Sequence, residues 1–190
     1  SIKKPEALCG VFFSWVFFAI ICAVPYLFYG INITNSLFES VSGITTTGAT
    51  ILQDFSLYPK TLFFYRAMTQ WLGGMGIVVL FIAVLPKFAV AGRQMFSAES
   101  PGPVEEKVTP RIRHTASWLW GIYLGLTIVQ IIALKLCGMD FYNALCNTLA
   151  TVSTGGLSPN PESIIGYHNQ KAGSVIGIFM VLSGANLILE

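Results

Sequence analysis

The sequence predicts an all-α integral membrane protein, and three observations support this prediction. The chain has 190 residues, of which 54% are hydrophobic and 11% are charged, whereas soluble domains average about 25% charged residues. Several apolar segments reach the roughly 20 residues that a helix needs to cross a bilayer. The same order of segments also occurs twice along the chain. The net charge of +2 is small and dispersed, so the composition gives no basis for nucleic-acid binding.

Four segments are apolar enough to form membrane helices. The first is too long and too aromatic for a signal peptide. Most Lys and Arg residues lie before the first segment or between the second and third, which the positive-inside rule assigns to the cytoplasm. The two long connectors, residues 30–60 and 138–171, therefore face outward. We expect the four helices at Leu8–Tyr29, Ala67–Pro86, Thr115–Leu134 and Ala172–Leu189.

Each outward connector begins with a short amphipathic segment. These segments are residues 32–44 and 139–152, where apolar side chains recur at helical spacing. Thr34 or Asn35 is a suitable N-cap for the first, and Asp140 for the second. Both segments run into threonine, serine and glycine residues. We therefore expect two half-length helices, each ending at a Thr/Gly loop.

The two Thr/Gly loops belong to an internal repeat. An offset of 108 residues pairs Thr46 with Thr154 in the loops. A two-residue insertion later in the unit pairs Gly74 with Gly184. Each unit therefore consists of a long helix, a short pore helix, a loop and a second long helix. We expect one unit at residues 1–86, a cytoplasmic linker at residues 87–114 and the other unit at residues 115–190.

Loops without helical structure are unusual at membrane depth, because their backbone groups must be covered by protein or must meet water or ions. Carbonyl and hydroxyl oxygens can replace the hydration shell of a monovalent cation when the backbone turns them inward. Glycine permits the backbone angles that this requires, and threonine adds oxygen atoms. The negative ends of the pore-helix dipoles also favour a cation. We therefore predict an ion filter formed by Thr45, Thr46, Thr47, Gly48, Ser153, Thr154, Gly155 and Gly156.

Several longer stretches resemble one family of membrane transport proteins. The stretches are FESVSGITTTGAT, FYRAMTQWLGGMGIVVLFIAVLP, PGPVEEKVTPRIRHTA and LATVSTGGLS, with SIIGYHN and LSGAN further on. Together they resemble the TrkH potassium uptake proteins, whose superfamily also contains KtrB and the fungal Trk transporters. The likeness covers essentially the whole chain. It implies four potassium-channel-like units around one pore, of which this chain resembles the second and third.

The resemblance implies a function and a set of partners. The function is potassium uptake across a bacterial inner membrane, by a multi-pass pore-forming subunit of a Trk-type system. A sodium-coupled or less selective monovalent cation transporter of the same superfamily is the alternative. No enzymatic activity, cofactor or metal is implied apart from the transported K⁺. The implied partners are the lipid bilayer, the first and fourth units, a second copy in a homodimer and a cytosolic nucleotide-binding TrkA-type subunit.

The second loop departs from the TTTG pattern of the first. Gly155 stands where the first loop has Thr47, so the second loop offers one side-chain oxygen fewer. This difference would relax the preference for potassium over sodium. A different registration would place Gly155 on Gly48, but it also places Val152 on Thr45 and is less favourable.

The resemblance further implies a gate in the helix after the second loop. In the family, a flexible loop interrupts this helix below the filter, and residues 182–190 resemble the beginning of that loop. A close-packed helix interface of small residues is the alternative, and it is also the expected role of Gly73–Gly76. The candidate gate residues are Ser183, Gly184, Ala185 and Asn186.

Arg66 needs a partner, because it lies near the outer end of an apolar helix. A charge at the bilayer centre costs about 2.5–3.5 kcal/mol. Glu39, Asp54 and Asp140 are the candidate partners, and each is alternatively placed to draw cations toward the pore mouth. We favour the structural pairing.

Overall fold

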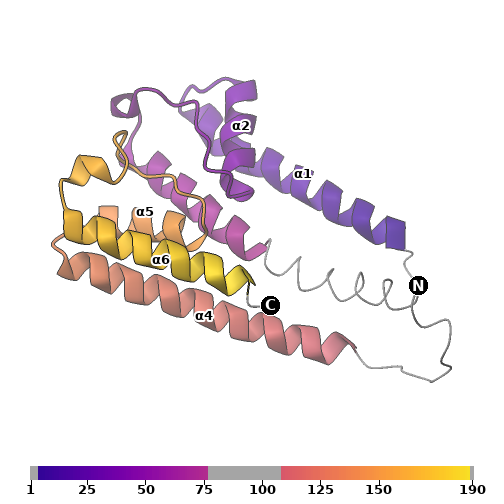
Figure 1. The fold of residues 1–190 in the computed structure, drawn as a ribbon. Helices are drawn as coiled ribbons and strands as arrows, with labels where there is room; N and C mark the ends of the chain where they lie inside the picture. The colour runs from indigo at the N-terminus through magenta and orange to yellow at the C-terminus, as the bar shows by residue number, and fades with distance from the viewer. Residues whose placement is uncertain (1–3, 77–107, 189–190) are drawn as a thin grey trace.

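The structure, a computed structural model, describes residues 4–76 and 108–188. All regular structure in these two ranges is helical, which confirms the predicted fold class (Figure 1). One helix at residues 60–76 carries no label in Figure 1 and is called the bridging helix below. The other elements are α1 (Lys4–Phe28), α2 (Ile33–Ile44), the 3-10 helix η1 (Phe55–Leu57), α4 (Val108–Leu136), α5 (Phe141–Val152), η2 (Ile165–Tyr167) and α6 (Gln170–Ile188).

Two helices of the described ranges are long and apolar enough to cross a membrane. They are Cys9–Phe28 within α1 and Ser117–Leu136 within α4, close to the first and third expected spans. The side chains of Phe12, Phe13 and Phe17 are 63%, 66% and 66% exposed on α1, as expected for a helix with apolar surroundings. α6 is also helical, over 19 residues. The second expected span extends beyond the described residues.

The helix α4 begins at Val108, earlier than the expected start at Thr115. The sequence predicts no continuous helix in this part of the linker, because it contains Pro110. This proline lies in the first helical turn, where the backbone N–H that proline lacks has no intrahelical partner in any case. The part of the predicted linker before Val108 lies outside the described residues.

The elements recur with the offsets found in the sequence. α2 and α5 begin and end 108 residues apart, and the ends of α1 and α4 have the same separation. η1 and η2 lie 110 residues apart, as do the starts of the bridging helix and α6. The two-residue insertion therefore lies between the pore helix and the 3-10 helix of the second unit. Gly30 and Gly138, just after the first helix of each unit, have φ of 78° and 86°. The same chain path is therefore followed twice.

Each unit holds its own pore helix against a long helix. In the first, Ser40 of α2 donates a hydrogen bond of 2.6 Å to the carbonyl of Ala19 in α1, and Cys22 and Ile44 pack beside them. In the second, α4, α5 and α6 share a core that includes Leu134. Small residues and hydrogen bonds of this kind stabilise helix contacts within membranes. Figure 1 shows the bridging helix, in magenta, between these two groups.

Candidate functional site

The first Thr/Gly loop starts with a Schellman cap at the end of α2. The N–H of Thr46 donates to the carbonyl of Gly43, and the N–H of Thr47 donates to the carbonyl of Ser42, both at 3.0 Å. These bonds satisfy carbonyls that the helix end would otherwise leave unpaired. Thr46 has a φ of 54°, a left-handed conformation that glycine normally supplies in this cap. A threonine held there costs about 1–2 kcal/mol.

The second loop ends α5 with the same cap. The N–H of Thr154 donates to the carbonyl of Thr151, and the N–H of Gly155 donates to the carbonyl of Ala150, both at 2.9 Å. Thr154 has a φ of 56°, almost that of Thr46. Two threonines at equivalent positions are therefore held in the same strained conformation.

The loop glycines distinguish the two possible registrations. Gly48 and Gly156 share a left-handed conformation, with φ of 74° and 75°. Gly155 is not left-handed, so the registration that places it on Gly48 would pair unlike conformations. The backbone therefore supports the offset of 108.

Some of the loop hydroxyl groups brace the pore helices. Thr45 donates from Oγ1 to the carbonyl of Val41 at 2.7 Å, and this Oγ1 lies 2.8 Å from Oγ1 of Thr47. Ser153 donates in the same way to the carbonyl of Leu149 at 2.8 Å. The hydroxyls of Thr45 and Ser153 are therefore directed back along their helices, and their contribution is structural.

The structure brings the two loops into direct contact. A Cβ atom placed on Gly48 would overlap the backbone carbonyl oxygen of Gly155. The first loop therefore has room for glycine alone at this point, for a steric reason as well as a conformational one. The assignment of the two loops to an ion filter stays a prediction, but the two loops are neighbours in space at Gly48 and Gly155.

The bridging helix contacts both loops through consecutive glycines. A Cβ on Gly73 would overlap the carbonyl of Ile44, which is the last residue of α2. A Cβ on Gly74 would lie 3.0 Å from Cβ of Ser153 and 2.9 Å from Oη of Tyr123. These glycines form the predicted close-packed interface, although their neighbours are loop and pore-helix ends.

A buried ion pair fixes the chain that leaves the first loop. Nε of Arg66 lies 3.1 Å from Oε2 of Glu39, at ion-pair distance but without hydrogen-bond alignment. The two side chains are 2% and 0% exposed. The other carboxylate oxygen of Glu39 accepts hydrogen bonds from Oγ1 of Thr50 at 2.6 Å and from the N–H of Ile51 at 2.8 Å. The expected pairing of Arg66 with an acidic side chain is confirmed, and Glu39 is the partner among the three candidates.

The other two acidic candidates have local structural roles. Asp54 accepts hydrogen bonds from the N–H and hydroxyl of Ser56 at 2.9 and 2.6 Å. These bonds favour the charged form and lower the pKa of Asp54. Asp140 accepts from the N–H of Tyr142 at 3.1 Å and is the N-cap of α5, as predicted.

The N-cap of α2 differs from the prediction. Asn32 caps this helix, because its backbone is extended and its side-chain oxygen accepts from the N–H of Asn35 at 2.8 Å. Thr34 and Asn35 lie inside the helix, which begins at Ile33. Asn32 lies two and three residues before the predicted caps, and it satisfies the N–H group of Asn35, which has no partner within the helix.

The candidate gate residues lie in an unbroken helix. α6 continues through Ile188, so the expected start of an interruption at Ser183, Gly184, Ala185 and Asn186 is not observed. A single glycine costs a helix only about 1 kcal/mol relative to alanine, which packing readily offsets. The side chain of Ser183 is 5% exposed and so lies in such a packed environment.

Gln70 was not predicted as part of the site. An ideal Cβ on Gly155 would lie 2.5 Å from Nε2 and 2.6 Å from Cδ of this glutamine, whose side chain is fully buried. The available signal was a glutamine in an apolar helix, together with the missing side chain in the second loop.

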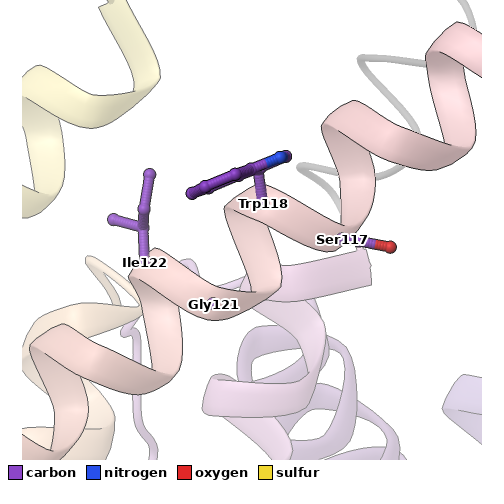
Figure 2. Close-up of a pocket in the computed structure, with 4 residues that line it drawn as sticks. All are labelled: Ser117, Trp118, Gly121 and Ile122. Carbon is purple, nitrogen blue, oxygen red and sulfur yellow. The ribbon is translucent and has the colours of Figure 1, made fainter.

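A pocket of about 320 Å³ lies on α4, apart from the loop residues. It is lined by Ser117, Trp118, Gly121 and Ile122, which Figure 2 shows on neighbouring turns of the helix. Within residues 4–76 and 108–188, no group of His, Cys and acidic side chains could hold a metal ion.

Comparison with known proteins identifies the family. The profile described as "TrkH: Cation transport protein" matches residues 5–189. The Trk system potassium uptake proteins TrkH and TrkG of Escherichia coli K12 are 41% and 40% identical over 98% and 100% of the chain. The crystal structure of the potassium transporter TrkH from Vibrio parahaemolyticus matches 96% of the chain with a TM-score of 0.79 and 32% identity.

The chain spans about two fifths of these relatives, namely 39% of TrkH, 40% of TrkG and 36% of the crystallised protein. The similarity is to transporters and not to enzymes, as the sequence predicted. The chain belongs to the TrkH family of cation transport proteins.

Proposed function

We propose that the two Thr/Gly loops are adjacent segments of a selectivity filter for K⁺, in the pore-forming subunit of a Trk-type potassium uptake system. The observation that carries this proposal is the pair of loops with matching caps and matching glycines, in contact at Gly48 and Gly155. The curated relatives are named as potassium uptake proteins, which supports the choice of cation.

The helix ends favour a cation at this point. α2 and α5 both end at the loops, so the negative ends of their dipoles meet where the loops meet. Carbonyl and hydroxyl oxygens suit a weakly hydrated monovalent ion, whereas an anion would be repelled by both helix ends. The side-chain oxygen that Gly155 lacks leaves a less selective or sodium-coupled cation transporter as the second candidate.

The proposal extends to the setting of the pore. Two loops do not close a ring, so the filter also needs the first and fourth units that the family resemblance implies. We place the protein in a bacterial inner membrane, as a homodimer controlled by a cytosolic TrkA-type subunit. The candidate gate at residues 183–186 belongs to the proposal and would act as part of a helix.

The variant Gly48→Ser tests the filter. A serine there would adopt a left-handed backbone and overlap the carbonyl of Gly155. We expect the preference for Rb⁺ over Na⁺ to fall about tenfold, which is equivalent to about 1.4 kcal/mol. The measurement is Rb⁺ and Na⁺ uptake by potassium-uptake-deficient cells that express the full reading frame.

The matched control is Gly177→Ser in α6, where an added Cβ meets no atom within 4 Å. It should leave rate and preference unchanged. If Gly48→Ser reaches the membrane and also changes neither quantity, the loop is structural and the filter proposal is wrong. Equal Rb⁺ and Na⁺ uptake by the wild type would favour the second candidate.

A further inference from the structure

The absence of a side chain at Gly155 has no conformational cause. The offset of 108 pairs this glycine with Thr47, which carries a side chain. Gly155 lies outside the left-handed region, unlike its neighbour Gly156, so its backbone would accept any residue. Packing must therefore explain why this position is a glycine.

The packing partner is Gln70 of the bridging helix. Its amide occupies the space that a Cβ on Gly155 would need, with Nε2 at 2.5 Å, Cδ at 2.6 Å and Oε1 at 2.9 Å from the ideal Cβ position. The side chain is fully buried, and neither Oε1 nor Nε2 has a hydrogen-bond partner among the described residues. A buried amide in this state requires an explanation.

The two loops differ in side chains at the place beside Gln70. In the first loop, the hydroxyl of Thr47 lies 2.8 Å from that of Thr45. The second loop has Ser153 and Gly155 at the equivalent positions, so it lacks this pair. The amide of Gln70, which comes from the first unit, lies at the vacant place.

We infer that Gln70 replaces, in the second loop, the side chain that Thr47 supplies in the first, and thereby positions the Gly155 segment for cation selection. This inference rests on the proposed filter function. Gln70 is a positioning residue from one unit that completes the loop of the other. The second loop is then not deficient, since its missing polar group is provided from the neighbouring helix.

A double-mutant cycle tests the contact. In the wild-type background, Gly155→Ala forces a methyl group against the amide of Gln70, and we expect a loss of Rb⁺ uptake because this side chain is fully buried and has little room to move. In the Gln70→Ala background, the same methyl group has room, so Gly155→Ala should cost little more. Gly177→Ala is the control and should be neutral in both backgrounds, because its Cβ meets nothing within 4 Å. Additive effects of Gln70→Ala and Gly155→Ala would overturn the inference.

Ion preference tests the positioning role. Gln70→Ala should lower the preference for Rb⁺ over Na⁺ about three- to tenfold, because the Gly155 segment loses the buried amide packed against it. Adding Gly155→Thr to Gln70→Ala restores a hydroxyl beside Ser153 and should regain most of that preference. Both quantities are measured by uptake in cells expressing the full reading frame, normalised to the protein recovered from the membrane.

The outcomes separate the inference from the function on which it rests. If Gly48→Ser lowers the preference but Gln70→Ala does not, the filter stands and the role of Gln70 is wrong. If Gln70→Ala inserts poorly, recovery of inserted protein by the added Gly155→Thr supports the inference, and failure to recover contradicts it. If Gly48→Ser has no effect, the filter proposal itself is wrong. The double-mutant cycle still tests whether Gln70 and Gly155 are in contact.

Discussion

Replacing Arg66 with alanine is expected to destabilise the folded protein by about 3–5 kcal/mol, the typical cost of removing one partner of a buried ion pair. The substitution leaves the carboxylate of Glu39 fully buried without its counter-charge. It also removes the guanidinium group whose Cζ lies 5.7 and 5.6 Å from the ring centroids of Phe55 and Phe63. The measurement is the melting temperature of the purified full-length protein.

Two controls separate the ion pair from the loss of a positive charge. Lys171→Ala removes an exposed cation and should leave the melting temperature almost unchanged. Arg66→Met combined with Glu39→Gln removes both charges at similar volume and should recover much of the loss. An Arg66→Ala protein as stable as the wild type would show that the pair does not hold the chain after the first loop.

Replacing Gly73 with alanine is the second change with a large expected effect. The added methyl group would overlap the backbone carbonyl of Ile44, and a backbone group cannot move aside as a flexible side chain can. We expect a loss of about 3 kcal/mol, at the upper end of the usual cost of overpacking, together with loss of Rb⁺ uptake. Folded protein recovered from the membrane and Rb⁺ uptake measure the two effects.

The same GGMG sequence contains the matched control. A Cβ on Gly76 would lie 3.5 Å from the ring of Trp15, at an ordinary van der Waals distance. Gly76→Ala should therefore be tolerated. It is a matched control because it changes the same residue type on the same helix. Equal damage from the two substitutions would indicate a general need for flexibility, and equal tolerance would show that α2 can move away from the bridging helix.

Local sequence signals predicted the pore helices well. The structure places α2 at Ile33–Ile44 and α5 at Phe141–Val152, within two residues of the predicted segments. Apolar spacing fixed their faces, and the threonine and glycine residues fixed their ends. The N-cap of α2 was harder, because the sequence offers several capping residues in succession and only the backbone angles distinguish Asn32 from the others.

Errors arose where a local rule met its structural context. Proline at position 110 predicts an end to helix, but the first turn of a helix accepts proline. Gly184 was taken to begin a break, but α6 continues through it. The effect of Pro110 depends on its place in the first turn, and that of Gly184 on packing elsewhere along the helix.

Contacts between the units could not be predicted from the sequence. The contact of Gln70 with Gly155 joins a residue of the first unit to one of the second, and no sequence periodicity relates the two positions. The pairing of Arg66 with Glu39 was predicted only as one of three possibilities, because buried charge demands a partner without specifying which. The choice among distant partners depends on how the helices pack.

The consecutive glycines of the bridging helix have a mechanical consequence. Neighbouring residues on an α-helix point about 100° apart, and here Gly73 rests on the end of α2 while Gly74 rests on Ser153. Both contacts are close approaches of the same stretch of helix, so neither can change without the helix that makes the other. In the proposed filter, a movement of this one helix would therefore act on both neighbouring loops together.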